Sequence, residues 1–168
     1  MTKVVCIDSN ICIWGIKKEG DQKKIPYATK FLSDLENNGT KILLPSPVII
    51  ELLSHLKNDE QKNKILALLD NHRIIVKPLD KLATLKCGEL LYKTFTDTEI
   101  IAYTKKHKVD KSKIKFDALI TAIAIVNKCN CIYTDNYDDF IRYSHGEINI
   151  QRMPETILQT DLFGNPII

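Results

Sequence analysis

The sequence predicts an α/β fold in three layers, with a parallel sheet of four to five strands flanked by helices. Short apolar runs alternate along the chain with longer segments of helical pattern, as in strand–helix–strand units. The first run, Val4–Ile7, is wholly apolar, which is typical of a strand buried on both faces. The chain has 168 residues, 44% of them hydrophobic and 27% charged, which suits a single domain with a sizeable core.

Turn and cap residues divide the first half of the chain into elements. Pro26 and Gly39 bracket a helix, because proline suits the first turn and glycine the position after the end. Ser46 followed by Pro47 is typical of a helix opening with Ser46 as its N-cap. Pro78 stops a strand, since proline cannot donate a ladder hydrogen bond. The expected helices here are 27–38, 46–57 and 59–71, and the expected strands are 42–44 and 73–77.

The second half continues the alternation. Asp80 is expected to cap a helix, and Thr96 with Glu99 forms the pattern of a capping box for the next one. Ser112 opens the most apolar helix, which has hydrophobic residues on nearly every side and is therefore expected to be central and buried. The expected helices are 80–92, 96 to the lysine-rich stretch, and 113–128, and the expected strands are 131–134 and 148–150. Parallel strands of this kind need right-handed crossovers, and their ligand sites gather beyond the carboxyl ends of the strands.

The net charge of +3 is unevenly distributed. Six lysines lie within eleven residues beside one acid, Asp110, which gives that stretch a charge of +5. They are Lys105, Lys106, Lys108, Lys111, Lys113 and Lys115. Such a cluster favours contact with a polyanion, and a solvated helix end is the equal alternative.

Two further features concern the compartment. No apolar run approaches the ~20 residues of a membrane span, and the apolar strand begins too early to leave room for a signal peptide. The five cysteines are odd in number and lack the spacing of zinc ligands, so buried or free thiols are expected. We therefore expect a cytoplasmic protein without a membrane anchor.

Several carboxylates fall at one edge of the expected sheet. Asp8 directly follows the first strand and Asp135 the strand at 131–134, while Asp139 begins the next helix. Asp117 is the acid inside the most apolar helix, and Glu51 lies one turn into its own helix between apolar neighbours. Charges in such surroundings are costly unless they are paired. A divalent cation that prefers oxygen ligands, Mg²⁺ or Mn²⁺, would neutralise them.

Each acid also has a purely structural explanation. Asp8 could cap a helix that begins near Asn10, and Glu51 could face solvent on an amphipathic helix. Asp135 and Asp138 could be turn formers, which is their commonest use after a strand. The functional interpretation depends on the joint placement of these acids and not on any one of them.

Four segments resemble the signature segments of PIN domains, in the same order. They are V-V-C-I-D-S-N at 4–10, V-I-I-E-L-L at 48–53, F-D-A-L-I-T-A-I-A at 116–124 and I-Y-T-D-N-Y-D-D-F at 132–140. The resemblance covers about residues 3–152 and is closest to VapC-type toxins of toxin–antitoxin modules. It implies a metal-dependent endoribonuclease with an RNA substrate, an antitoxin partner and a homodimeric state. It also implies one PIN-like domain over 1–168, with a lysine-rich helical segment around 80–112 that a compact toxin does not need.

The resemblance also assigns the site. Asp8, Asp117 and Asp139 are expected to bind metal, with Glu51 orienting water or a second metal. Many members carry an aspartate where this chain has Asn136, which leaves Asp139 and Asp135 as candidates for the fourth acid. Alternation along the strand favours Asp139, because it turns Asp135 away from its two neighbours. The expected supporting hydrogen-bond donors are Asn10, Thr134 and Asn136.

Three other functions compete with cleavage of RNA by this site. A degenerate PIN domain would bind RNA or a protein without cutting, and Asn136 is the residue that favours this alternative. A phosphatase of the haloacid dehalogenase type needs an aspartate two residues after the first, where this chain has Asn10. A flap-type DNA nuclease usually carries more acids and a helical arch. Metal-dependent RNA cleavage therefore remains the leading prediction.

Overall fold

The computed structural model describes residues 3–54, 56–95, 102, 105 and 111–155. Its centre is a five-stranded sheet in the order β3-β2-β1-β4-β5, and every neighbouring pair of strands is parallel. The strands are β1 (Val4–Ile7), β2 (Lys41–Pro45), β3 (Ile74–Lys77), β4 (Cys131–Thr134) and β5 (Asn149–Arg152). The predicted α/β fold with a parallel sheet is confirmed.

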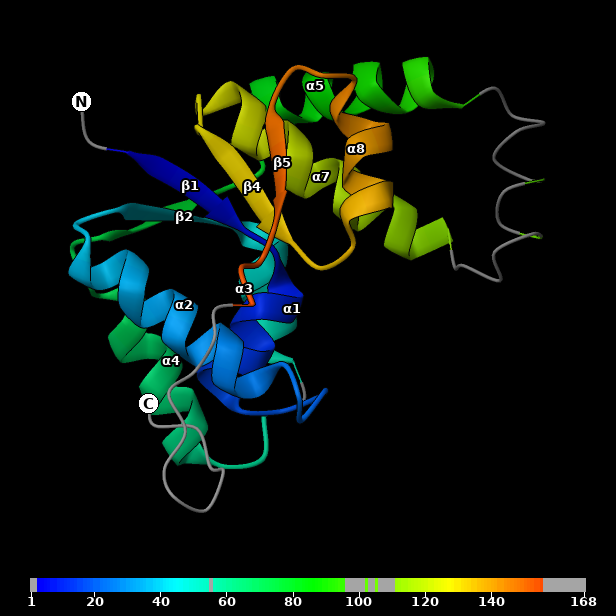
Figure 1. The fold of residues 1–168 in the computed structure, drawn as a ribbon. Coiled ribbons are helices and arrows are strands. Elements are labelled where there is room, and N and C mark those ends of the chain that lie inside the picture. The colour runs from blue at the N-terminus through cyan, green and yellow to red at the C-terminus, as the bar shows by residue number, and fades with distance from the viewer. Residues whose placement is uncertain (1–2, 55, 96–101, 103–104, 106–110, 156–168) are drawn as a thin grey trace.

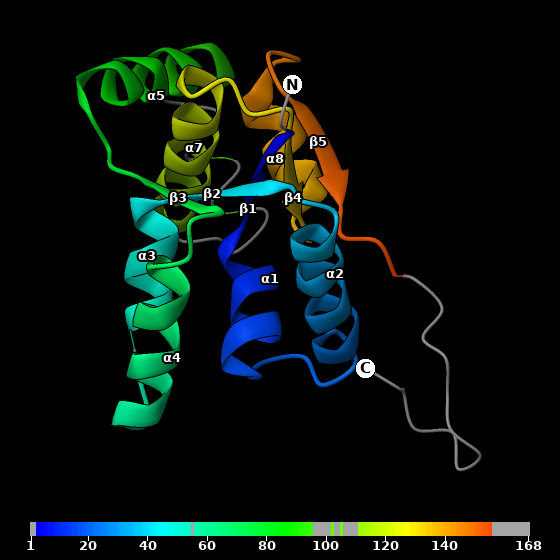
Figure 2. The same ribbon diagram turned by 90° about the vertical axis from the view of Figure 1, so that its left-hand side faces the viewer.

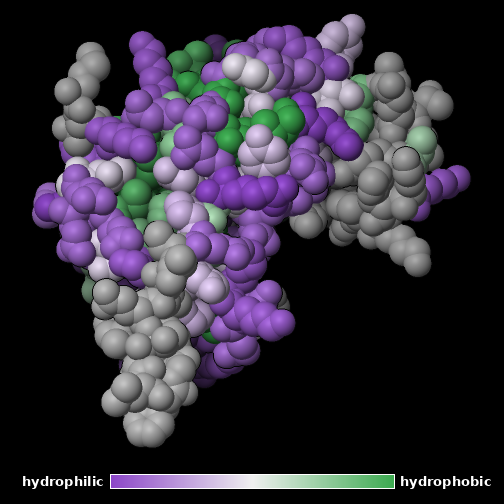
Figure 3. All heavy atoms as spheres, in the orientation of Figure 1, coloured by the Kyte–Doolittle hydropathy of each residue, from purple (hydrophilic) through white to green (hydrophobic). Residues whose placement is uncertain are grey.

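Helices cover both faces of this sheet (Figure 1). Seen along a second direction, the sheet lies between α5, α7 and α8 on one side and α1, α2 and α4 on the other (Figure 2). The helices are α1 (Ser9–Cys12), the π-helical turn η1 (Ile13–Lys17), α2 (Ile25–Asn37), α3 (Ser46–Leu53), α4 (Asp59–Leu69), α5 (Lys81–Thr94), α7 (Lys111–Val126) and α8 (Tyr137–Ser144). The face seen in Figure 1 is largely hydrophilic, with hydrophobic side chains reaching the surface beside β5 and α8 (Figure 3).

The cap of α3 differs from the expectation. The helix begins at Ser46, so Pro45 occupies the N-cap position and the prediction that Ser46 is the N-cap is wrong. The Ser46 hydroxyl is used elsewhere, accepting a hydrogen bond from the backbone N–H of Leu79 at 3.2 Å. The helix also ends at Leu53, earlier than expected. In contrast, Asp80 caps α5 as predicted, accepting from the N–H of Ala83 at 2.8 Å.

The core supports the expectation for α7. Its residues from Ala118 to Ala124 are buried except Leu119, and the helix packs against α5, α8 and the sheet. Of the expected helix that starts at Thr96, the structure describes only residues 102 and 105. Most side chains of the lysine cluster lie outside the described residues, and Lys105 is exposed. Within the described part of the chain, no helix is long and apolar enough to cross a membrane.

Candidate metal-binding acid site

Asp8 is fixed where β1 meets β4. Its backbone N–H donates to the carbonyl of Tyr133 at 3.0 Å, and its side chain is buried at 3% exposure. One carboxylate oxygen accepts the hydroxyl of Thr134 at 2.8 Å. The other accepts the N–H of Ser9 at 2.8 Å and the Ser9 hydroxyl at 3.2 Å, so Asp8 also caps α1. The structural and the functional explanation of Asp8 are therefore compatible.

A second buried acid lies at the other end of the same network. Asp117 on α7 is 7% exposed, and its Oδ2 accepts the side-chain amide of Asn136 at 3.0 Å. The backbone N–H of Asn136 donates to the hydroxyl of Thr134 at 2.9 Å. Asp8, Thr134, Asn136 and Asp117 thus form one continuous hydrogen-bonded chain, which we call the acid chain. It joins the carboxyl ends of β1 and β4 to the side of α7.

Burial controls the charge of Asp8. Removal from water raises the pKa of the Asp8 carboxyl to about 6, although the hydrogen bonds from Thr134 and Ser9 work in the opposite direction. The negative charge of Glu51, which is half-buried on α3, makes the last and smallest contribution to this raised pKa. Within the described residues, Asp8 forms no ion pair with a lysine or arginine. The carboxylate is thus held where a cation would relieve its cost.

The acids after β4 have different surroundings. Asp135 pairs at 3.3 Å with Lys24, which directly precedes α2, and its side chain remains 39% exposed. Asp138 is 90% exposed, and Asp139 lies partly buried in the first turn of α8. Thr134 and Asn136 both belong to the acid chain, whereas Asp135, which follows the end of β4, is turned toward Lys24. Asp139 remains the candidate for the fourth acid.

The donor set fits a hard divalent cation better than zinc. The acid chain offers carboxylate, amide and hydroxyl oxygens, which are the ligand types of Mg²⁺ and Mn²⁺. Among the described residues, however, no three side chains of the types Asp, Glu, His and Cys stand close enough together to hold an ion. The five cysteines are free and buried, and burial raises the pKa of the Cys6 thiol, so it stays protonated. Asp8 and Asp117 are therefore the two predicted ligands that the structure links.

Sequence reasoning missed two contributors to this region. Ser9 donates both its N–H and its hydroxyl to Asp8, and its position directly after the acid was the available signal. Lys24 neutralises Asp135 across more than a hundred residues of sequence, which no local pattern reveals. Conversely, Asn10 was expected to donate to a carboxylate, yet it lies half-buried on α1 without a hydrogen bond to either acid of the chain.

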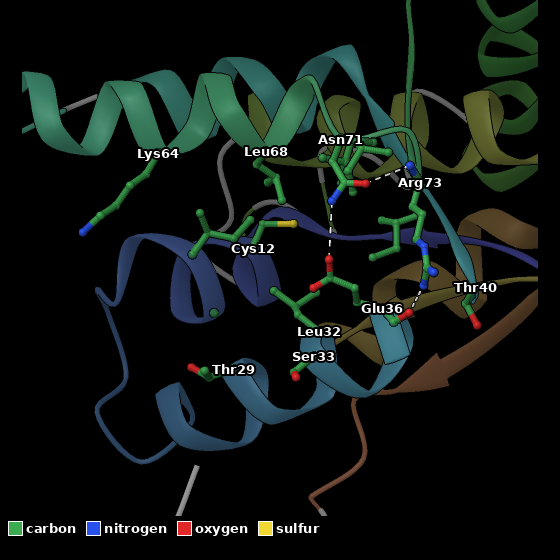
Figure 4. A pocket seen from close by; sticks show the side chains of 15 residues that line it. Cys12, Thr29, Leu32, Ser33, Glu36, Thr40, Lys64, Leu68, Asn71 and Arg73 are labelled. Carbon is green, nitrogen blue, oxygen red and sulfur yellow. Dashed lines mark hydrogen bonds between the residues drawn. The ribbon is translucent and has the colours of Figure 1, made fainter. Parts of the chain in front are cut away.

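A cavity of about 350 Å³ lies apart from the acid chain, between α2 and α4 and over β2 and β3 (Figure 4). Its wall is mostly apolar, with Leu32 and Leu68 facing each other from the two helices. At one end Arg73 donates to the backbone carbonyl of Glu36, whose carboxylate accepts from Asn71 at 3.5 Å. No residue of the acid chain lines this cavity.

Comparison with known proteins agrees with the geometry. The chain is similar to VapBC2 from Rickettsia felis bound to a DNA fragment from its promoter, with a TM-score of 0.59 and 21% identity over 90% of this chain and 99% of the other. It is similar to DNA-bound VapBC from Salmonella typhimurium, with a TM-score of 0.58 and 18% identity over 92% of this chain and 100% of the other. It is also similar to VapBC-1 from nontypeable Haemophilus influenzae, with a TM-score of 0.56 and 15% identity over 89% of this chain and 98% of the other. At these identities the likeness shows a shared fold.

The family is assigned from a match to the sequence. No curated protein matches the chain. The profile of the PIN domain, however, matches residues 5–146, which include the acid chain and Glu51. Because this match spans most of the sequence and the sheet has the corresponding fold, the chain belongs to the PIN domain family.

Proposed function

We propose that this protein is a metal-dependent endoribonuclease of the VapC type. PIN domains are generally nucleases that use divalent metal ions. The observation that carries the proposal is the acid chain, which holds two buried carboxylates at the carboxyl edge of a parallel sheet. Burying two acids costs stability, and such a cost is typical of a site that is built for a cation.

Each residue of the site has a proposed part in the reaction. Asp8 and Asp117 would hold the metal together with Asp139, and Thr134 and Asn136 fix the orientation of the first two carboxylates. Glu51, whose charge reaches Asp8, orients the attacking water. A divalent ion, when bound, lowers the pKa of water and stabilises charge on the phosphate. Water would attack the phosphorus in line with its bond to O3′, so that this bond breaks, O3′ takes up a proton, and the products carry a 3′-hydroxyl and a 5′-phosphate.

A cleavage assay tests this function. The purified protein should cut single-stranded RNA with Mg²⁺ or Mn²⁺ and stop when a chelator is added. Asp117→Asn should abolish cutting, whereas Asp70→Asn, at an exposed position beyond the end of α4, should retain it. Cutting that survives in Asp117→Asn would place the reaction elsewhere. Binding of RNA without cutting would instead support the degenerate PIN domain that Asn136 suggests.

The proposed partner is an antitoxin protein. All three similar structures are VapBC assemblies. The cavity between α2 and α4 presents an apolar wall outside the acid chain, and we assign it to an apolar segment of the antitoxin. Coexpression with the product of the neighbouring reading frame should give a stable complex, and Ser33→Arg on the exposed side of the cavity should weaken it. We further propose that the protein acts in the cytoplasm as a homodimer of single PIN-like domains.

A further inference from the structure

A positively charged side chain, Arg152, lies on the strand next to the acid chain. Arg152 is the last residue of β5, and its register partner on β4 is Thr134, the residue that bonds Asp8. Register partners on neighbouring parallel strands point to the same face of a sheet. The side chain of Arg152 therefore leaves the sheet on the face and at the edge where the acid chain lies.

An aromatic ring supports this arginine. The guanidinium carbon of Arg152 lies 4.8 Å from the centre of the Tyr137 ring, and Tyr137 directly follows Asn136 in the chain. The side chain of Arg152 is 61% exposed, and its ion pair with Asp138 spans 3.7 Å to a partner that is 90% exposed. An exposed pair of this kind contributes little. The ring thus positions the cation while most of its charge stays available to a ligand.

Two other positively charged side chains, Lys24 and Lys17, already have partners. Lys24, on the opposite face, pairs with both Asp135 and Glu155. Lys17 is buried, donates to the backbone carbonyl of Ser54 at 3.1 Å and pairs with Glu19 at 3.6 Å. Of these three cations, Arg152 is the one whose charge is least neutralised.

An open hollow continues from the same tyrosine. It measures about 450 Å³ and lies between α8 and β5, where hydrophobic side chains reach the surface in Figure 3. Tyr137, Ile141 and Ile150 provide its apolar lining. An unstacked nucleobase binds to surfaces of this type, and arginine is a preferred phosphate ligand.

We infer that Arg152 binds a phosphate of single-stranded RNA beside the acid chain and that the base of this nucleotide lies in the hollow between α8 and β5. This inference rests on the proposed nuclease function and adds the path of the strand. Tyr137 is a positioning residue in this arrangement, because it holds Arg152 at the edge of the hollow. The single-stranded form is specified because a paired base would first have to lose its pairing and stacking before it entered the hollow.

RNA binding at several salt concentrations tests the inference. The parent protein is Asp117→Asn, which keeps the RNA intact, and the probe is a short labelled RNA in the presence of Mg²⁺. Adding Arg152→Gln should weaken binding about tenfold and flatten the slope of log K against log salt by ~0.7. Ile141→Ser should weaken binding at an unchanged slope, because it removes apolar contact and no charge. Lys41→Gln, at the amino end of β2, removes the same charge at the opposite edge and should change neither.

The outcomes separate the two levels of the proposal. If the parent protein binds RNA and Arg152→Gln behaves like Lys41→Gln, the phosphate contact is wrong while the nuclease function stands. If Ile141→Ser binds as the parent does, the base does not lie in the hollow. If the parent does not bind RNA at all, the proposed function and the inference fall together. Equal affinity for a duplex of the same sequence would also exclude an unstacked base.

Discussion

Asp8 shows how one residue can serve both the fold and the site. Its backbone N–H donates to the carbonyl of Tyr133 and so joins the ends of β1 and β4, and its carboxylate caps α1 by accepting from the N–H of Ser9. The same carboxylate accepts the hydroxyl of Thr134 and so begins the acid chain. Because burial opposes its negative charge, the position costs stability whenever the carboxyl is ionised without a cation. The pH dependence of folding should reveal this cost.

Replacing Asp8 by asparagine should stabilise the metal-free protein at neutral pH. The folded-state pKa of about 6 exceeds the ordinary value of 3.8, so the folded protein holds the proton more tightly than the unfolded chain. The stabilisation from the neutral carboxyl is complete below about pH 4, declines between about pH 4 and 6, and is absent above. Asp8→Asn should therefore raise the free energy of unfolding above pH 6 by about 1–3 kcal/mol, while abolishing cleavage.

Urea denaturation of both proteins across this pH range measures the difference. The carboxyls of Glu19, Glu60, Glu89 and Glu147 have lowered pKa values and act in the opposite direction, but they contribute equally to both proteins and cancel. If the wild type and Asp8→Asn have the same free energy of unfolding at pH 8 and the same dependence of it on pH, the ionised carboxyl of Asp8 carries no cost of burial.

Thr134 should be important through its hydroxyl alone. The buried side chain donates to Asp8 and accepts from the backbone of Asn136, so Thr134→Val leaves two polar groups without this partner. We expect the free energy of unfolding to fall by about 2 kcal/mol and the cleavage rate to fall with it. Thr134→Ser retains the hydroxyl and is the matched control. Similar losses in the two variants would assign the effect to packing instead.

The two candidates for the fourth acid should differ in activity. Asp139→Ala should reduce cleavage more than tenfold, whereas Asp135→Ala should change it little, because Asp135 is turned toward Lys24 and away from the acid chain. Loss of that partly exposed ion pair should cost less than ~1 kcal/mol in stability. Measured kcat/KM values for both variants decide between them. A larger loss in Asp135→Ala would mean that the strand direction does not determine the ligand set.

At the scale of elements, the sequence was informative wherever the chain carries a strong local pattern. The apolar run of β1, the cap of α5 and the buried helix α7 were all predicted, because each follows from short-range rules. The helices α1 and η1 were expected only under the alternative in which Asp8 caps a helix that begins near Asn10. The reason is that Ser9–Lys17 lacks a helical period and depends on tertiary packing. The early end of α3 at Leu53 likewise has no sequence signal as strong as a proline or glycine.

The lysine-rich segment allows a test at this scale. Lys105 is exposed, and the other lysines of the cluster have side chains outside the described residues. If the segment contacts RNA, changing Lys105, Lys106 and Lys108 to glutamine should weaken RNA binding for all sequences alike. The salt slope should fall by ~0.7 for each lost contact, with little change in turnover at saturating RNA. An unchanged slope would remove this segment from the RNA-binding surface.

At the scale of the whole molecule, the parallel sheet is what turns separate motifs into one site. The rule that ligand sites lie beyond the carboxyl ends of strands predicted that Asp8 and Asp135 share one edge of the sheet. At this edge Thr134 bonds Asp8, whereas Asp135 pairs with Lys24. The contact of Asn136 with Asp117 was not predictable, because it depends on how α7 crosses the sheet. Pairings such as Lys24 with Asp135 also require the folded structure. The four residues of the acid chain were thus named from the sequence, and the hydrogen bonds between them came from the fold.

Titration of Mn²⁺ into the purified protein, followed by calorimetry, tests most directly whether the acid chain is a metal site. We expect the wild-type protein to bind the ion, and Asp8→Asn and Asp117→Asn each to lose most of that affinity. Asp70→Asn should bind as the wild type does, since its position lies outside the acid chain. Equal Mn²⁺ affinity in all four proteins would contradict the assignment of Asp8 and Asp117 as the metal ligands.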